Sequence, residues 1–146
     1  MRIARRPTSA IAIALTDAEE AVVNSLYILG DADRIREKVE ASLFANDLAG
    51  LNTFSTNLTE AISRIVQRMN ERLSATVIMA GGDDVFFIVA ADRFNLSLLG
   101  EIASDFTKET GCTISFGVGA SPDSAYLLLR HAKAAGGGAI RVGPHQ

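Results

Sequence analysis

The stretch TVIMAGGDDVFFIV at residues 76–89 constrains the fold of this chain most, because it joins two apolar, β-branched-rich runs through Gly-Gly-Asp-Asp. Such runs predict paired strands, and the glycines predict a tight turn whose backbone can lie close to a ligand. A purely structural hairpin needs one acidic residue at most, whereas Asp83 and Asp84 place two at this turn. Because neighbouring carboxylates repel one another when both are ionised, a divalent cation is their natural counter-ion.

Length and composition bound the possible classes of protein. The chain has 146 residues, 48% of them hydrophobic and 21% charged, which suits one domain with a proper core. Its net charge of -3 disfavours direct binding of a polynucleotide, which usually requires a basic face. A small nucleotide that arrives with its own metal ion is compatible with this charge.

Cysteine usage and hydropathy indicate the compartment. The single cysteine, Cys112, lies in the apolar run CTISFGVG without a partner for an intramolecular disulfide, which favours a small buried residue over a nucleophile. The best apolar run near the start, AIAIAL at 10–15, is too short to span a bilayer and shorter than a usual signal-peptide core. We therefore predict a soluble cytoplasmic protein without membrane insertion.

The first 22 residues differ from the rest of the chain. They are basic, then apolar, then acidic, and they precede a strand that is already complete. They fit an edge strand, a disordered arm, or translation from an upstream start, in which case the native chain would begin at Val22 or Val23. We therefore divide the chain into an N-terminal extension at 1–22, without assigned function, and a folded domain at 23–146.

Apolar periodicity predicts a strand and two helices before the hairpin. SLYIL at 25–29 is a short strand that ends in Gly-Asp-Ala-Asp. Apolar residues four apart then predict a helix that turns Ile35, Val39 and Leu43 inward. After a break near 46–50, a longer helix has an apolar stripe of Phe54, Leu58, Ile62, Ile65, Met69 and Leu73.

Two helices and two strands are predicted after the hairpin. A helix at 95–110 is closed by Gly111, and TISFGV follows as a strand. Ser121-Pro122 supplies an N-cap and first position for the last helix, and AIRV forms a final strand. The expected inward residues of these helices are Leu96, Leu99, Ile102, Ala103, Phe106, Leu128, Leu129 and Ala132. This order of strands and helices predicts an α+β fold of ferredoxin-like palm type, with helices on one face of a mainly antiparallel sheet.

Strand order brings a third acid to the hairpin. In such a fold the first strand lies beside the hairpin, so we expect Asp31 to meet Asp83 and Asp84 although they are far apart in sequence. Carboxylate oxygens suit Mg²⁺ or Mn²⁺. Two such ions would activate a sugar 3′-hydroxyl and hold a triphosphate with its leaving pyrophosphate. The three aspartates are the predicted catalytic and metal-binding residues.

Several of these residues have a competing structural interpretation. Asp31 fits a solvated loop acid, and Asp84 fits a residue that satisfies the turn. Asp33 either caps the first helix or takes part in the site. Lys133 either complements the dipole of the last helix or reaches a triphosphate as a point charge. Arg130 and the adjacent histidine are expected at the surface.

A group of glycines completes the predicted nucleotide contacts. Gly30 and the amides that open the first helix offer a phosphate cradle, because helix N-termini favour anions. Gly81 and Gly82 bring the hairpin backbone close to a ligand. With Asp33 and Lys133, these glycines are the predicted nucleotide-binding residues.

Four segments, in order and at suitable spacing, match one known family. They are YILGDADRIREKVE, AGGDDVFFIV, TISFGVGAS and AYLLLRHAKAAG. From about residue 25 to residue 142 the chain resembles the minimal CRISPR polymerase-like family, mCpol, a stand-alone relative of the CRISPR polymerase palm and of GGDEF diguanylate cyclases. Residue by residue, the resemblance implies metal-binding roles for Asp31 and Asp83, an adjacent acid at Asp84 and a phosphate-contacting Lys133.

The resemblance implies an activity and its partners. It implies that residues 23–146 form a palm-type nucleotide cyclase that makes a cyclic oligonucleotide, particularly a cyclic di-AMP-type dinucleotide from ATP, in bacterial defence against phage. It also implies two Mg²⁺ or Mn²⁺ ions per site and a separate, often membrane-bound effector that recognises the nucleotide. Because a palm this small holds one nucleotide, joining two requires a homodimer, most simply with twofold symmetry.

Departures from the GGDEF pattern bear on the base. Asp84-Val85 replaces Glu-Phe after the turn, and Met79 stands where those enzymes have an arginine. Gly137-Gly138 replaces the Arg-Asn that follows the terminal glycine. These departures disfavour a guanine-specific diguanylate cyclase and favour an adenine-based product.

Two other classes of function stay open. A non-catalytic nucleotide-sensing palm would bind a nucleotide tightly without releasing pyrophosphate. A diguanylate cyclase, or a hydrolase resembling archaeal GTP cyclohydrolases, would act on GTP with the same fold. The adjacent acids disfavour a sensor, because binding alone does not need them.

Overall fold

The computed structural model describes residues 24–144, so the predicted extension at 1–22 lies outside the described part of the chain. The predicted order of strands and helices is confirmed, although the first strand runs on past residue 29. In chain order the elements are β1 (Ser25–Ala32), α2 (Ile35–Phe44), α3 (Leu48–Leu73), β2 (Thr76–Gly81), β3 (Asp84–Ala90), α4 (Leu96–Thr110), β4 (Ile114–Gly119), α5 (Pro122–Ala134) and β5 (Ile140–Val142).

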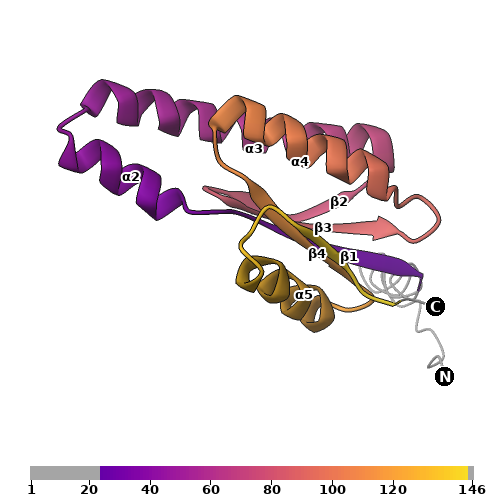
Figure 1. Ribbon diagram of the computed structural model, residues 1–146. Coiled ribbons are helices and arrows are strands. Elements are labelled where there is room, and N and C mark those ends of the chain that lie inside the picture. Colours follow the sequence, from indigo (N-terminus) through magenta and orange to yellow (C-terminus); the bar gives the residue numbers. More distant parts are fainter. Residues whose placement is uncertain (1–23, 145–146) are drawn as a thin grey trace, which may run out of the picture.

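The strands form one sheet in the order β2-β3-β1-β4-β5, with β1 at its centre (Figure 1). β1 pairs antiparallel with β3 and β4, whereas β5 joins β4 in parallel. The predicted α+β fold with a mainly antiparallel sheet is thus confirmed. The pairing of β1 with β3 sets Asp31 directly opposite Asp84, which brings the end of the first strand to the hairpin.

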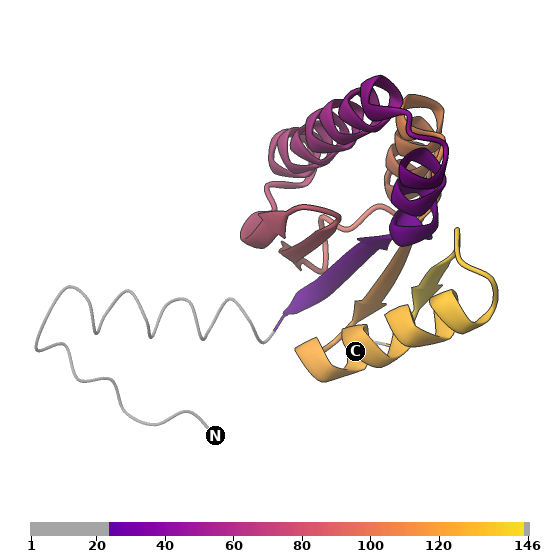
Figure 2. The same ribbon diagram turned by 90° about the vertical axis from the view of Figure 1, so that its left-hand side faces the viewer.

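Helices cover both faces of the sheet, which corrects the expectation that they pack on one face. α2, α3 and α4 lie on one side, and α5 lies on the other (Figures 1 and 2). Glycine in β4 permits the close approach of α5: a Cβ at Gly117 would lie 2.2 Å from the carbonyl oxygen of Ala125. The helix turns Ala125, Leu129 and Ala132 to the sheet as buried residues.

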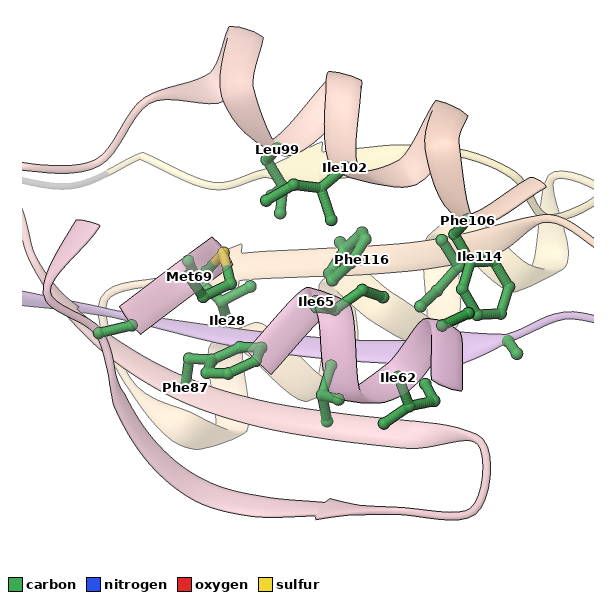
Figure 3. Packing of buried hydrophobic residues seen from close by; sticks show 14 of the residues in the cluster. Ile28, Ile62, Ile65, Met69, Phe87, Leu99, Ile102, Phe106, Ile114 and Phe116 are labelled. Atoms are coloured by element: carbon green, nitrogen blue, oxygen red, sulfur yellow. The ribbon is translucent and has the colours of Figure 1, made fainter. Parts of the chain in front are cut away.

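The main core lies between the sheet and helices α3 and α4 (Figure 3). Alternate strand residues such as Ile28, Phe87 and Phe116 are buried in it, as the period of two requires. Every residue of the predicted stripe on α3, from Phe54 to Leu73, is buried. Burying an apolar side chain of this size contributes about 1.5–3 kcal/mol, so this stripe holds α3 on the sheet.

Two residues that we expected to face inward are exposed. Leu43 and Leu96 are each 50% exposed. α2 packs beside α3 beyond the ends of the strands, so its inner face holds only the half-buried Ile35 and Val39 (Figure 1). Leu96 is the first residue of α4, where the helix has not yet reached the core.

Cys112 is buried just before β4, as predicted. Burial raises the pKa of its thiol, so the thiol is protonated at neutral pH and is a poor nucleophile. Within residues 24–144, no helix combines the length and apolar character needed to cross a membrane.

Asp47 caps helix α3, because its Oδ1 accepts a hydrogen bond from the backbone N–H of Gly50 at 2.8 Å. We expect Asp47→Ala to lower the free energy of unfolding by about 1 kcal/mol, since that N–H loses its acceptor. Urea denaturation followed by circular dichroism measures the change. Asp92→Ala, at an exposed acid in the turn before α4 whose N-cap is Asn95, is the control; an equal loss in both variants would contradict the cap.

Candidate functional site

A two-residue turn joins β2 to β3, with Gly82 and Asp83 at its tip between the paired Gly81 and Asp84. Gly82 has a φ of 57°, in the left-handed region that glycine adopts without steric cost. A Cβ added at Gly81 or Gly82 would meet nothing within 4 Å. The turn therefore has the open, approachable backbone that the two glycines predict.

Three aspartates converge where this turn meets the end of β1. Asp31, Asp83 and Asp84 each offer a carboxylate oxygen, and these oxygens all lie within 4.8 Å of one another. Cross-strand pairing positions Asp31 beside Asp84, and the backbone positions the turn, because the N–H of Ala32 donates to the carbonyl oxygen of Asp83 at 2.8 Å. The structure thus brings together the acids that strand order predicted.

This acid cluster, Asp31, Asp83 and Asp84, fits a divalent metal ion. Within residues 24–144 the cluster has one ion pair, between Asp31 and the ammonium of Lys133, so negative charge is in excess. Excess carboxylate charge favours a bound cation, and hard oxygen ligands suit Mg²⁺ or Mn²⁺. The three oxygens, all within 4.8 Å of one another, are close enough together that the three side chains could hold such an ion.

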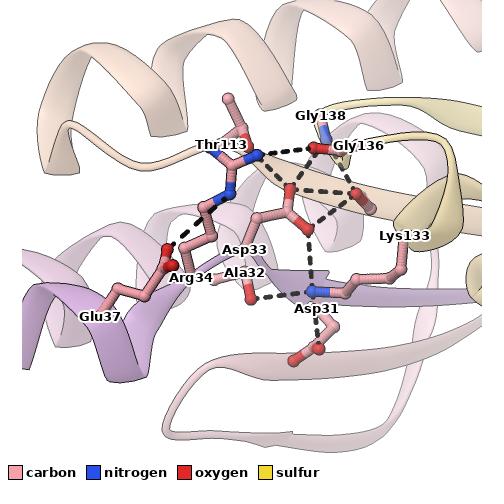
Figure 4. Close-up of polar contacts among 10 residues, drawn as sticks. Asp31, Ala32, Asp33, Arg34, Glu37, Thr113, Lys133, Gly136 and Gly138 are labelled. Carbon is pink, nitrogen blue, oxygen red and sulfur yellow. Dashed lines mark hydrogen bonds and ion pairs between the residues drawn. The ribbon is translucent and has the colours of Figure 1, made fainter.

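Lys133 reaches Asp31 of the acid cluster from helix α5 (Figure 4). Its Nζ lies 2.8 Å from Oδ2 of Asp31 and 2.9 Å from Oδ1 of Asp33, and it donates to the carbonyl oxygen of Ala32 at 2.9 Å. A lysine that only complemented the helix dipole would need none of these contacts, so the structure favours a place for Lys133 in the site. Arg130 and His131 are exposed, as predicted.

Asp33 lies behind the acid cluster, and only 5% of its side chain is exposed. Its carboxylate accepts hydrogen bonds from the hydroxyl of Thr113 at 2.8 Å, the hydroxyl of Ser115 at 3.0 Å and the backbone N–H of Gly138 at 2.8 Å. The N-cap of α2 is Arg34, without a side-chain cap, so the capping alternative for Asp33 is wrong. Its predicted contact with a nucleotide stays a prediction.

The ion pair between Asp33 and Lys133 shifts both groups toward their charged forms. Burial alone would raise the pKa of Asp33, but hydrogen bonds from Lys133, Thr113, Gly138 and Ser115 outweigh it and lower that pKa. Burial alone would lower the pKa of Lys133, but its contacts with Asp31 and Asp33 raise it. The pair is therefore ionised at neutral pH.

Gly30 has a packing role in the sheet. It is buried within β1, paired with Val85 of β3 and with Phe116 of β4. A Cβ at Gly30 would lie 2.5 Å from the ring of Phe116 and 2.9 Å from a methyl group of Val85. The enclosed position explains the glycine, and its predicted contact with a nucleotide stays a prediction.

The predicted site residues do not include Thr113, Ser115 or Gly138, which hold Asp33. Thr113 immediately precedes β4 and Ser115 lies two positions later within it, so extended backbone turns both hydroxyls to the same side, where both reach Asp33. Hydroxyl residues at alternate positions within the apolar run CTISFGVG were the available signal. The amide of Gly138 left no signal, because a backbone contact has no side-chain pattern.

Comparison with solved structures relates the fold to polymerase palms. The Csm1-Csm4 cassette in complex with cA4 is 23% identical, with a TM-score of 0.63, and the match covers 84% of this chain and 21% of that one. The cassette in complex with one ATP is 22% identical, with a TM-score of 0.64 and coverages of 84% and 21%. This chain therefore spans about a fifth of the length of the chains it matches there.

A nucleotide cyclase has a similar fold over nearly its whole length. The active GGEEF domain of a diguanylate cyclase from Vibrio cholerae is 11% identical, with a TM-score of 0.55, and the match covers 92% of both chains. At these identities the likeness shows the fold, an α+β palm.

Sequence comparison with protein families gives the closer assignment. No curated protein matches the chain. The family model of mCpol, the minimal CRISPR polymerase domain, matches residues 27–142, which include the acid cluster and Lys133. The resemblance that the four sequence segments indicated is confirmed, and the chain belongs to the mCpol family of minimal CRISPR polymerase domains.

Proposed function

We propose that this chain is a metal-dependent nucleotidyltransferase that makes a cyclic oligonucleotide second messenger, of the cyclic di-AMP type, from ATP. The observation that supports this most is the convergence of Asp31, Asp83 and Asp84 beside an open glycine turn. A site that only recognises a nucleotide does not need three clustered acids, of which Asp31 alone pairs with the ammonium of Lys133. Family membership and the palm fold favour nucleotidyl transfer over other chemistry at such a site.

Each residue of the site has a proposed task. The acid cluster holds two Mg²⁺ or Mn²⁺ ions through its carboxylate oxygens. When bound, these ions lower the pKa of the attacking 3′-hydroxyl and neutralise the leaving pyrophosphate. Lys133 exchanges an acid contact for the triphosphate, which it meets as a point charge. Gly81 and Gly82, without side chains, let the phosphates lie against the turn.

Adenine is the proposed base. The Csm1-Csm4 cassettes that share this fold were solved in complex with ATP, pppApA and cA4. The departures from the GGDEF pattern at Met79, Asp84-Val85 and Gly137-Gly138 disfavour guanine. We therefore propose ATP as the substrate, with other nucleoside triphosphates as alternatives for the assay.

A homodimer is part of the proposed mechanism. One palm of this size holds one nucleotide, so two 3′-hydroxyl attacks on two α-phosphates require a second copy that faces the first. We expect light scattering to detect a dimer when ATP and Mg²⁺ are present, and a persistent monomer would contradict the mechanism. We further propose that the protein is cytoplasmic and acts in phage defence. A separate effector protein would bind its product.

One experiment tests the proposed function. Purified protein is incubated with each nucleoside triphosphate and Mg²⁺ or Mn²⁺, and the products are identified by mass spectrometry together with a pyrophosphate assay. We expect a cyclic adenine dinucleotide and pyrophosphate from ATP, and no product after EDTA treatment. A sensor would bind ATP without releasing pyrophosphate, and a GTP hydrolase would form a product from a single nucleotide without a dimer; either outcome would replace the proposal.

A further inference from the structure

We infer that Asp33 is a positioning residue: it ties the glycine loop at 136–138 to the end of β1 and thereby aims Lys133 at the acid cluster. Asp33 on this view touches neither metal nor nucleotide. The kinetic part of the inference rests on the proposed function, whereas its structural part does not.

The hydrogen bonds of Asp33 leave its carboxylate little capacity for another ligand. Oδ1 is contacted by Lys133 at 2.9 Å and by the hydroxyl of Ser115 at 3.0 Å. Oδ2 accepts from Thr113 at 2.8 Å, from Ser115 at 3.0 Å and from the N–H of Gly138 at 2.8 Å. Ser115 has one hydroxyl hydrogen, shared between the two oxygens, so four donor groups face the roughly four lone-pair sites of the carboxylate. Asp33 is thus saturated from within the protein, unlike the open acid cluster.

The glycine loop is shaped to lie on this carboxylate. Gly136, Gly137 and Gly138 have φ values of 110°, 81° and 67°, all in a region that side chains disfavour. A Cβ at Gly137 would lie 2.7 Å from Cγ of Asp33, whereas a Cβ at Gly136 would meet nothing within 4 Å. The loop backbone therefore packs directly against Asp33 at its middle residue.

The same loop is continuous with the helix turn that bears Lys133. The N–H of Gly136 donates to the carbonyl oxygen of Lys133, and the N–H of Gly137 donates to that of Ala132, each at 3.1 Å. From the other side, the N–H of Asp33 donates to the carbonyl oxygen of Thr113 at 2.8 Å. A displacement of the loop would therefore move the base of a long, flexible lysine side chain away from the acid cluster.

A pair of glycine variants tests the contact between the loop and Asp33. Gly137→Ala and Gly136→Ala both place a side chain at a positive φ, but only Gly137→Ala pushes on Asp33. We expect Gly137→Ala to lower kcat/KM for ATP by about tenfold or more relative to Gly136→Ala, as is usual when a supporting contact behind a site is lost. Equal activity of the two variants would overturn the inference.

Asp33→Asn separates positioning from metal binding. We expect its affinity for Mn²⁺, measured by electron paramagnetic resonance without nucleotide, to stay within about twofold of the wild type, while Asp83→Asn loses Mn²⁺ by about tenfold or more. An equal loss in Asp33→Asn would make Asp33 a ligand and overturn the inference. The Gly138 amide donates both to Oδ2 of Asp33 at 2.8 Å and to Oγ of Ser115 at 2.9 Å. Its hydrogen exchange should be faster in Asp33→Ala, which removes the charged acceptor, than in Ser115→Ala; the reverse order would also contradict the inference.

A double-mutant cycle with Lys133 distinguishes positioning from a merely structural role. If Asp33 acts through Lys133, adding Asp33→Asn to Lys133→Ala changes kcat/KM by less than about twofold, because the group to be aimed is already absent. Independent, multiplying effects would show that Asp33 only supports the fold. Should Asp33→Asn fail to fold, Thr113→Val removes one donor to the same carboxylate and enters the same cycle. Mn²⁺ binding and amide exchange remain informative even if no nucleotide is turned over.

Discussion

Asp83→Asn should lower the rate of product formation from ATP by about 10³-fold or more, while the protein stays folded. The reason is that its carboxylate oxygen lies within 4.8 Å of those of Asp31 and Asp84, so its loss removes a shared ligand of the proposed metal ions. Steady-state kinetics with a pyrophosphate assay measures the effect. Because Asp83 is one of three clustered acids, relieving their repulsion should leave the free energy of unfolding unchanged or slightly increased.

Variants of other aspartates serve as controls for Asp83→Asn. Asp92→Asn removes the same charge from an exposed turn outside the acid cluster, so it should retain the activity of the wild type. Asp84→Asn and Asp31→Asn should resemble Asp83→Asn, both in turnover and in their weakened affinity for Mn²⁺. Full activity of Asp83→Asn in the presence of Mg²⁺ would refute the site assignment.

Gly117→Ala should destabilise the fold by about 3 kcal/mol and lower the midpoint of thermal unfolding by about 10 °C. The added Cβ would lie 2.2 Å from the carbonyl oxygen of Ala125 and 2.4 Å from the backbone nitrogen of Leu129. Both neighbours are helix backbone, so no rotamer change relieves the overlap and α5 must move. Since α5 bears Lys133, we also expect a lower kcat/KM for ATP. Differential scanning calorimetry and kinetics measure the two effects.

Gly100→Ala is the matched control for a methyl group added to a glycine. Gly100 lies in helix α4, and a Cβ there would meet nothing within 4 Å. Alanine is the better helix former, so this variant should gain about 0.5–1 kcal/mol. If Gly117→Ala were as stable as the wild type, the close packing of α5 on β4 would be wrong.

The local sequence pattern was sufficient to predict burial and turn geometry that depend on a single helix or turn. The apolar stripe of α3 is buried throughout because the helical period alone places Phe54 to Leu73 on one face. The hairpin turn follows from the backbone freedom of Gly82, which is a property of that residue. Strand order then sufficed for the acid cluster, since antiparallel pairing of β1 with β3 sets Asp31 opposite Asp84.

The local sequence pattern was insufficient to predict the role of a residue that packs against residues far away in the chain. The close packing of α5 on the sheet depends on the missing side chain of Gly117, and this need becomes visible only once Ala125 packs against that glycine. Gly30 resembled a phosphate cradle in sequence, yet the ring of Phe116 is what excludes a side chain there.

The Gly-Gly-Asp-Asp hairpin and its approach to Asp31 were therefore determined by the sequence itself, through turn geometry and strand order. Only the tertiary structure decided what lies behind the acid cluster. The hydroxyl of Thr113 and the amide of Gly138 reach Asp33 from 80 and 105 residues away in the chain. These contacts form only when β1, β4 and the glycine loop are packed together. Residue spacing along the chain predicts which side chains share a face of one helix or strand, but it does not predict contacts of this kind.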